Sequence, residues 1–258
     1  MNKLAREIGS GPCPLLGAAS YIGDPAFVEI AAHLGYRAMW FEMEHMLTSF
    51  REAAGLCALA SGLGMLTMIR IPDASRENVL RSAECGPDIL DLPMVNNPEV
   101  AREFVAHAKY APVGNRGLFG ASRASRYTIL GSVAEEQNRI NEDLCLMVQI
   151  ETRESASRAD EICAVPGIDA IFLGPGDMSA SFGVPGDTKD PRVRDALCTA
   201  LRAAERHGLI KAMMSPLDEV GFWTSQGVEL IFITSDVQSM KMGARSCLEI
   251  ALSGSAEG

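Results

Sequence analysis

The feature that most constrains the fold is an alternation of strand-like and helical segments along the whole chain. Short apolar runs recur between segments such as DPAFVEIAAHLG, in which Asp-Pro marks a helix start and Gly a helix stop. Strands that alternate with helices predict a parallel sheet, because parallel neighbours need a long crossover connection. The predicted strands cover residues 14–19, 37–44, 66–71, 89–95, 145–151, 170–175, 209–215 and 230–235.

Eight such repeats predict a closed (β/α)8 TIM barrel, an α/β fold, in a single domain over residues 1–258. An open, doubly wound sheet is the alternative, but eight strands and the lack of a GxGxxG phosphate loop make it the weaker interpretation. The longest irregular segment is 111–127. A loop of that length in a compact domain is usually a lid or a subunit contact.

Composition argues against several kinds of partner. The formal net charge is -10 and no basic tract is present, so neither nucleic acid nor an anionic membrane is an expected partner. The seven scattered cysteines form no CxxC pair, which favours a reducing cytoplasm over a disulfide framework or a zinc site. The N-terminal stretch MNKLAREIGSGPC lacks an apolar signal region, and no apolar run approaches ~18 residues. We therefore expect a cytoplasmic protein.

Polar side chains follow several predicted strands at their carboxyl ends, where barrels of this kind place catalytic groups. Because all eight strands run the same way, these side chains should converge on one mouth of the barrel. Strand by strand they are Glu42, Glu44 and His45, then Arg70, then Gln149 and Glu151, and finally Asp177.

His45 is the histidine whose position stands out. The other three histidines (33, 107 and 207) close predicted helices, where a cation complements the helix dipole. His45 instead follows a strand beside carboxylates, which makes it a candidate base, with a structural role as the alternative. Arg70 is a candidate to stabilise an oxyanion, and a plain ion pair is its alternative.

Glu151 and Asp177 follow neighbouring strands and form the candidate metal pair. Two carboxylates across one mouth would repel each other unless a cation lay between them. Oxygen ligands without Cys or a His pair favour Mg or Mn over Zn. Taken singly, Glu151 could favour the start of the next helix and Asp177 could cap the turn DMSAS. Gly174 and Gly176 would allow a ligand to approach the backbone closely.

The five lysines argue against Schiff-base chemistry. Only Lys211 lies in a predicted strand, and it lies near the strand's start, away from the mouth. An imine-forming enzyme needs a lysine in the mouth. A covalent imine is therefore not expected.

The segments WFEMEH, IR, QIET and FLGPGDMSASFG, with RGLFGASRASRY between them, resemble the HpcH/HpaI aldolases, the class II metal-dependent pyruvate aldolases. The resemblance runs from about residue 15 to residue 245. Glu42 and Glu84 stand where close relatives often have Asp, and Gly176 stands where many have Ala.

The resemblance implies a role for each matched position. Mg, Mn or Co would be held by Glu151 and Asp177, and pyruvate would meet Gln149, Asp177 and the amide of Gly176. His45 would act as the base through a metal-bound water, Arg70 would stabilise the enolate, and Glu84 would raise the basicity of His45. The resemblance also implies a homo-hexamer in which the final helix is exchanged between subunits and the mouth lies at an interface.

The expected reaction is the reversible cleavage of a 4-hydroxy-2-oxo acid to an aldehyde and pyruvate, or a close 2-oxo acid such as hydroxypyruvate, through a metal-bound enolate. Arg123 in the 111–127 segment is expected to meet the distal group of the substrate. Three alternatives stay open: an oxaloacetate decarboxylase using the same site, a citrate-lyase-β-like acyl-CoA lyase for which Arg116, Arg123 and Arg126 leave room, and a barrel that binds oxo acids without turnover.

Overall fold

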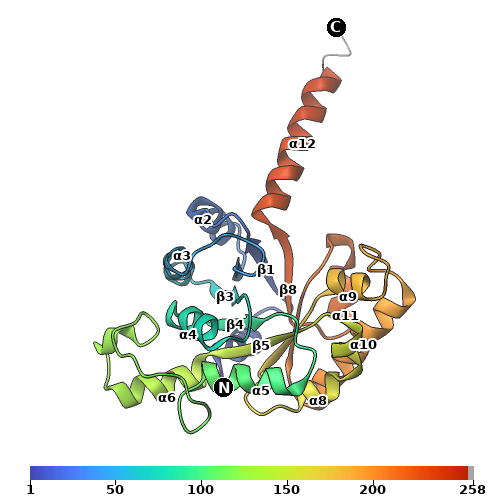
Figure 1. Cartoon of the computed structure of the whole chain (residues 1–258). Coiled ribbons are helices and arrows are strands. Elements are labelled where there is room, and N and C mark those ends of the chain that lie inside the picture. The colour runs from blue at the N-terminus through green and yellow to red at the C-terminus, as the bar shows by residue number, and fades with distance from the viewer. Residues whose placement is uncertain (255–258) are drawn as a thin grey trace.

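The computed structural model describes residues 1–254, and its eight strands close into one parallel barrel in chain order (Figure 1). The predicted barrel is confirmed, and the open-sheet alternative is wrong. The strands are β1 (Leu15–Ser20), β2 (Ala38–Glu42), β3 (Leu66–Arg70), β4 (Ile89–Leu92), β5 (Cys145–Ile150), β6 (Ala170–Leu173), β7 (Ile210–Met214) and β8 (Leu230–Ser235).

Each predicted strand is present, and the largest shift is at the end of β4. This strand ends at Leu92 instead of continuing to residue 95. Pro93 has no N–H to donate to a sheet, and Met94 adopts a left-handed φ of 56°. The chain therefore turns out of the sheet at this point.

Helices form the outer layer of the molecule, and their starts follow ordinary capping chemistry. Asp24 caps α2 ahead of a proline, as the sequence predicts, and Ser49 with Glu52 forms a capping box on α3. The helices are α1 (Lys3–Ser10), α2 (Pro25–His33), α3 (Phe50–Gly62), α4 (Arg76–Glu84), α5 (Pro98–Ala108), α6 (Val133–Asp143), α7 (Arg153–Ser157), α8 (Ala159–Cys163), α9 (Pro175–Ser181), α10 (Pro191–Arg206), α11 (Val220–Ser225) and α12 (Asp236–Gly254), with 3-10 turns η1 (Arg126–Thr128) and η2 (Leu217–Glu219).

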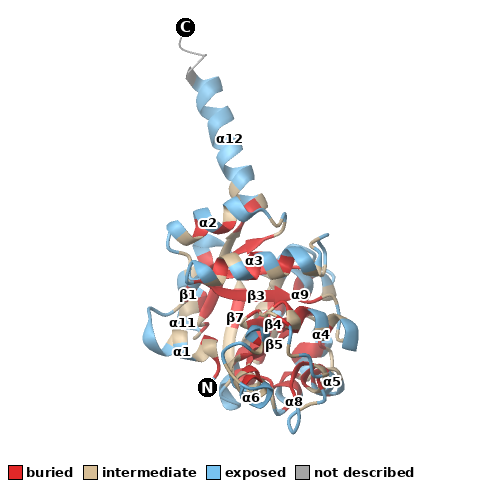
Figure 2. Cartoon of the chain, turned by 90° about the vertical axis from the view of Figure 1, so that its left-hand side faces the viewer, coloured by how far each residue is buried: buried red, intermediate tan, exposed pale blue. Residues whose placement is uncertain are grey.

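Two apolar cores hold the barrel together, and buried strands run through its centre in Figure 2. The larger core lies between the strands and the helices. The smaller one fills the barrel interior, where the Trp40 ring packs edge-on against Phe172 and Phe232 at centroid distances of 5.3 and 5.5 Å. Because the interior is filled, chemistry is confined to the two ends of the barrel.

Helix α12 leaves the mouth end and projects away from the barrel (Figures 1 and 2). Its base is fixed by Asp236, whose carboxylate accepts hydrogen bonds from the backbone N–H groups of Tyr21 and Ile22 and from the Ser20 hydroxyl. Residues 240–253 are exposed along their whole length. The exchange of this helix between subunits stays a prediction. Within residues 1–254, no helix has both the length and the apolar character that a membrane span requires.

The 111–127 segment reaches the end of the barrel opposite the mouth. Arg123 packs against Gly86, just before β4 begins, and its Nη2 donates to the Cys57 carbonyl on α3. Arg123 lines the same cavity as Lys3 and Leu144, at the amino-terminal ends of the strands. Within one chain this segment therefore does not close over the mouth, and the contact of Arg123 with the substrate stays a prediction.

Candidate active site

The strand register brings three charged side chains to one level inside the mouth. Glu42 on β2 pairs in register with Arg70 on β3, and Arg70 pairs with Asp91 on β4. In parallel strands, residues at one level point to the same face, so all three side chains enter the barrel. Glu42 and Asp91 are buried, and Arg70 is 9% exposed. A cluster of charge so far from water must be internally compensated.

Arg70 is the centre of this cluster. Its Nε lies 2.6 Å from Glu42 Oε2 and 3.2 Å from Glu44 Oε2, and its guanidinium stacks over the Trp40 ring at 4.9 Å. Burial disfavours the charged form, but the pKa of Arg70 is still raised because Glu42 and Glu44 favour the cation. Its Nη1 reaches Gln149 Oε1 at 3.5 Å, while its Nη2 has no acceptor among residues 1–254. The arginine is thus fixed on one edge and free to bind an anion on the other.

Gln149 lies fully buried behind Arg70. Its Nε2 donates a short hydrogen bond to Asp91 Oδ2, which leaves its Oε1 turned toward the guanidinium. In this arrangement the amide orients Arg70, and its contact with pyruvate stays a prediction. Burial raises the pKa of Asp91 well above its usual range, and Asp91 Oδ1 has no partner in the described chain. Sequence reasoning missed Asp91, although a lone carboxylate inside the apolar run ILDL was a usable signal.

Glu151 directly follows β5 and is 2% exposed. Its Oε1 accepts a hydrogen bond of 2.6 Å from the Met94 backbone N–H, which the left-handed turn after β4 presents to it. Burial, opposed by the Met94 hydrogen bond and assisted by the neighbouring Asp177 carboxylate, raises the pKa of Glu151 to about 7. The side chain therefore points into the site and does not serve the start of α7.

Asp177 lies in the first turn of α9 and is exposed at the mouth. The N-cap of α9 is Gly174, so Asp177 is not the cap of this turn, and its carboxylate accepts no hydrogen bond within residues 1–254. A Cβ on Gly174 would lie 2.6 Å from both Cβ and Oε2 of Glu151. Only glycine at this position leaves the Glu151 carboxylate room to lie against the end of β6.

These two carboxylates fit a divalent cation. Glu151 is buried with a raised pKa, Asp177 is free of partners within residues 1–254, and the charge of Asp177 disfavours the charged form of Glu151. Within residues 1–254, no group of three or more His, Cys, Asp or Glu side chains is arranged to hold a metal. A cation between Glu151 and Asp177 would thus take its remaining ligands from water and substrate, as Mg²⁺ sites commonly do.

His45 is brought to the same mouth, although it is largely exposed. Its Nε2 lies 3.5 Å from Glu44 Oε2, and its backbone N–H donates to Glu42 Oε1 at 3.0 Å. Burial raises the pKa of Glu44, against the opposing effect of Arg70. The carboxylate that meets the imidazole in this chain is therefore Glu44, two residues beyond the end of β2.

The structure does not bring Glu84 to this mouth in the single chain. It closes α4, and its Oε1 accepts a hydrogen bond of 2.8 Å from Arg116 Nη2. Arg123 is likewise remote, at the other end of the barrel. Gly176 lies at the second position of α9 and is exposed beside Asp177. Lys211 is the second residue of β7, far from the carboxyl end of that strand, as predicted.

The fold and the site define a (β/α)8 barrel whose mouth places the carboxylates Glu151 and Asp177 near an arginine with a free edge. The model of the HpcH/HpaI aldolase/citrate lyase family matches residues 21–242. The chain belongs to this family.

Relatives agree over nearly the full length. The hydroxypyruvate/pyruvate aldolase of Sagittula stellata is 30% identical over 217 residues, covering 84% of this chain and 85% of that protein. The 2-dehydro-3,6-dideoxy-6-sulfogluconate aldolase of Pseudomonas putida is 31% identical over 242 residues, covering 93% and 92%. The crystal structure of an HpcH/HpaI aldolase from Desulfitobacterium hafniense superposes with a TM-score of 0.89 at 28% identity, covering 97% of each chain.

Proposed function

We propose that this protein is a pyruvate aldolase that cleaves a 4-hydroxy-2-oxo acid to an aldehyde and pyruvate, or a close 2-oxo acid such as hydroxypyruvate, with a divalent cation at Glu151 and Asp177. The observation that carries the proposal is the free Nη2 edge of Arg70 in the same mouth as this carboxylate pair. Relatives named as aldolases for pyruvate and for a sugar-acid substrate support the same reaction class. Mg, Mn or Co would polarise the 2-oxo group and the carboxylate of the substrate.

The side chains of the site then divide the chemistry. The C4 hydroxyl of the substrate loses its proton to His45, directly or through water, and the C3–C4 bond breaks. The aldehyde leaves, and the electron pair of that bond remains on the three-carbon fragment as an enolate. Arg70 Nη2 donates a hydrogen bond to the enolate oxygen. This hydrogen bond is stronger in the transition state than in the ground state, because negative charge develops on the oxygen. Return of the proton to C3 gives pyruvate.

Supporting groups keep Arg70 in place for this step. Glu42 fixes Nε, and Gln149, itself held by Asp91, limits the rotation of Nη1. The amide of Gly176, beside Asp177 in the first turn of α9, would donate to the carboxylate of the oxo acid. Because Arg70 is fixed before the substrate arrives, it needs no reorganisation during the reaction.

The acyl-CoA lyase alternative receives no support from the charges around the mouth. It would need a basic cleft for the phosphates of the nucleotide. Arg116 and Arg126, like Arg123, line the cavity at the opposite end of the chain's own barrel. An oxaloacetate decarboxylase would use the same groups, and only turnover can separate it from an aldolase.

The decisive experiment measures pyruvate release from a panel of 4-hydroxy-2-oxo acids and from oxaloacetate. We expect aldol cleavage that disappears in EDTA, returns with Mg, Mn or Co, and falls about 100-fold or more in His45→Ala. Borohydride with pyruvate should leave both the activity and the mass of the protein unchanged. Full activity after exhaustive chelation, or a covalent adduct on Lys211, would contradict the proposal.

A further inference from the structure

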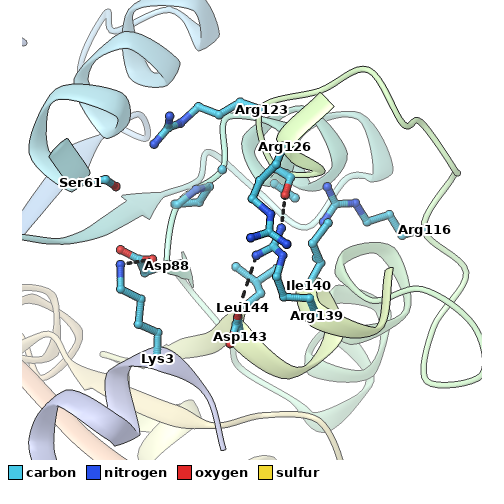
Figure 3. A pocket seen from close by; sticks show the side chains of 14 residues that line it. Lys3, Ser61, Asp88, Arg116, Arg123, Arg126, Arg139, Ile140, Asp143 and Leu144 are labelled. Carbon is cyan, nitrogen blue, oxygen red and sulfur yellow. Dashed lines mark hydrogen bonds and ion pairs between the residues drawn. The ribbon is translucent and has the colours of Figure 1, made fainter. Parts of the chain in front are cut away.

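A cavity lies at the end of the barrel opposite the mouth, between α1, the start of β4 and the 111–127 segment with α6. It has a volume of about 400 Å³, within the range of small-ligand pockets. Figure 3 shows arginines entering it from one side and the Lys3–Asp88 pair from the other. The proposed aldolase chemistry uses none of these groups.

Positive charge predominates on the wall of this cavity. Five cationic side chains line it, against two carboxylates, in a chain whose net charge is -10. Which of these charges is available to an anionic ligand depends on how many of them are paired within the chain. The cations are Lys3, Arg116, Arg123, Arg126 and Arg139, and the carboxylates are Asp88 and Asp143.

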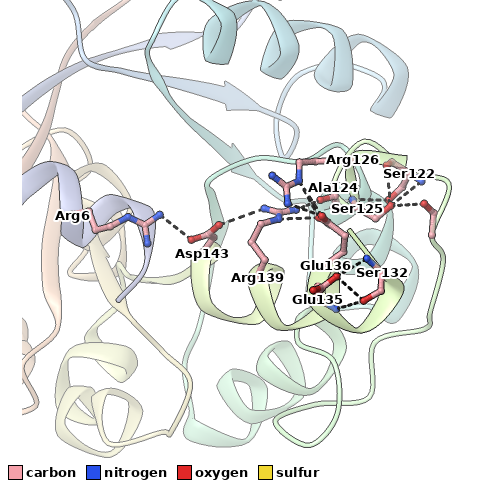
Figure 4. Close-up of polar contacts among 11 residues, drawn as sticks. Arg6, Ser122, Ala124, Ser125, Arg126, Ser132, Glu135, Glu136, Arg139 and Asp143 are labelled. Carbon is pink, nitrogen blue, oxygen red and sulfur yellow. Dashed lines mark hydrogen bonds and ion pairs between the residues drawn. The ribbon is translucent and has the colours of Figure 1, made fainter. Parts of the chain in front are cut away.

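Most of these cations already have a carboxylate partner. Lys3 Nζ lies 2.9 Å from Asp88, and Arg116 lies 2.8 Å from Glu84. Arg126 and Arg139 share the buried Glu136, as Figure 4 shows. Arg126 uses only Nε and Nη2 in this pair, so its Nη1 has no acceptor in the described part of the chain.

Arg123 is the exception. It makes no ion pair within residues 1–254, and its single acceptor is the Cys57 carbonyl, 3.2 Å from Nη2. Its stem lies against Gly86, where an added Cβ would come within 3.2 Å of Arg123 Cγ. Gly86 has a φ of +71°, so glycine suits both the turn and the close approach. The fold thus holds a partly buried guanidinium at the cavity with its charge uncompensated.

The backbone that carries Arg126 is strained. Arg126, Tyr127 and Thr128 have φ values of 48°, 55° and 49°, three successive residues in the left-handed region without a glycine. Each residue in this region costs on the order of 1 kcal/mol, and such strain persists only where the surroundings enforce it. The bonds of Arg126 to Glu136 help to hold this conformation, and Arg126 lines the cavity.

From these observations we infer that this cavity binds a small metabolite that carries a phosphate group, at a site separate from the catalytic mouth. The phosphate accepts hydrogen bonds from the free edges of Arg123 and Arg126, because planar guanidinium groups match its oxygen geometry. Ser61 and the Asp88–Lys3 pair line the cavity and are suited to hydroxyl groups of the same ligand. A phosphorylated polyol fits this distribution of charge and polarity better than a fully anionic ligand.

The test is calorimetric titration of the metal-loaded protein with glycerol 3-phosphate and, separately, with inorganic phosphate. We expect one site per chain, tighter binding of the ester than of inorganic phosphate, and no displacement by saturating pyruvate. Arg123→Gln should weaken binding of the ester by about tenfold or more, because one charge-assisted contact is lost. Arg102→Gln, which removes an exposed arginine paired with Glu99 on α5, is the matched control and should leave binding unchanged.

A second variant, Arg123→Lys, keeps the positive charge but lacks the planar guanidinium. Its affinity for the ester should lie between those of Arg123→Gln and the unaltered protein. Thermal unfolding of each variant verifies that it is folded before titration. Equal affinity in Arg123→Gln and the unaltered protein, competition by pyruvate, or no binding of the ester at millimolar concentration would each overturn the inference. None of these results depends on the aldolase activity.

Discussion

Glu151 illustrates at the scale of one residue how a functional group is kept at a cost in stability. Burial raises its pKa from 4.5 to about 7. Between these two pH values the folded protein binds more protons at this carboxyl than the unfolded chain does, so the free energy of unfolding falls as the pH rises through this window. Above pH 7 the full penalty applies, on the order of 3 kcal/mol. A bound cation would offset it.

We therefore predict that Glu151→Gln stabilises the metal-free protein at about pH 8 while abolishing activity. Glutamine can still accept the Met94 hydrogen bond but carries no charge. Urea unfolding in EDTA should show a gain of about 1–3 kcal/mol at this pH and little difference at about pH 4. Added Mg²⁺ should stabilise the unaltered protein and not the variant. The exposed Glu142→Gln serves as the control, and a loss of stability in Glu151→Gln at about pH 8 would contradict the argument.

The residues of the mouth differ in how far the sequence could reveal them. Glu42, His45, Arg70 and Glu151 could be placed there because each lies at or just beyond a strand end, a position that sequence periodicity locates. Asp91 could not, because its role depends on which side chain stands beside it in the closed barrel. Its contact with Gln149 joins residues 58 positions apart.

At the scale of elements, the turn from β6 into α9 decides the geometry of the carboxylate pair. Its two glycines have different surroundings. Gly174 has a φ of -103°, which any residue can adopt, but an added Cβ would lie 2.6 Å from the Glu151 side chain. Gly176 has no atom within 4 Å of such a Cβ. Gly174 is therefore required for a steric reason, whereas the surroundings of Gly176 leave room for a side chain.

We predict that Gly174→Ala displaces the Glu151 carboxylate and lowers kcat/KM by about 100-fold, the usual effect of an ångström-scale misplacement. It should also raise the Mg²⁺ concentration needed for half-maximal activity. Gly176→Ala is the matched control, with the same added methyl group in the same turn, and should change kcat/KM only a few-fold. Equal losses in the two variants would show that the Glu151 contact is not what matters.

The elements of this chain also differ in how well the sequence predicts them, and strands are easier to predict than loops. Apolar runs located all eight strands, because burial on both faces leaves a local signature in each. The 111–127 segment carries no such signature, and its path is set by contacts made elsewhere, as between Arg116 and Glu84 or between Arg126 and Glu136. Its three arginines could be singled out from the sequence, but the end of the barrel that they reach could not be predicted.

At the scale of the whole molecule, α12 is the element that the barrel does not explain. Residues 240–253 are exposed to water, although several of them are apolar. The side chains that are more than half exposed include Met240, Leu248, Ile250 and Leu252. A lone helix with this much exposed apolar surface is unfavourable in water and marks an interaction site. Asp236 anchors only its first turn. The family resemblance implies a hexamer with an exchanged final helix, and this geometry fits a helix that packs on another copy of the chain.

We predict that the double variant Leu248→Glu, Leu252→Glu lowers the oligomeric state without unfolding the barrel. The two side chains lie one turn apart on the same helix face, so two charges would have to be buried in any subunit contact made there. Light scattering after gel filtration should show the mass falling by at least half, while the thermal unfolding of the remaining fold stays cooperative. Lys241→Glu, an equally exposed change of charge near the base of the helix, is the control and should leave the mass unaltered. An unchanged mass in the double variant would remove this face of α12 from the subunit interface.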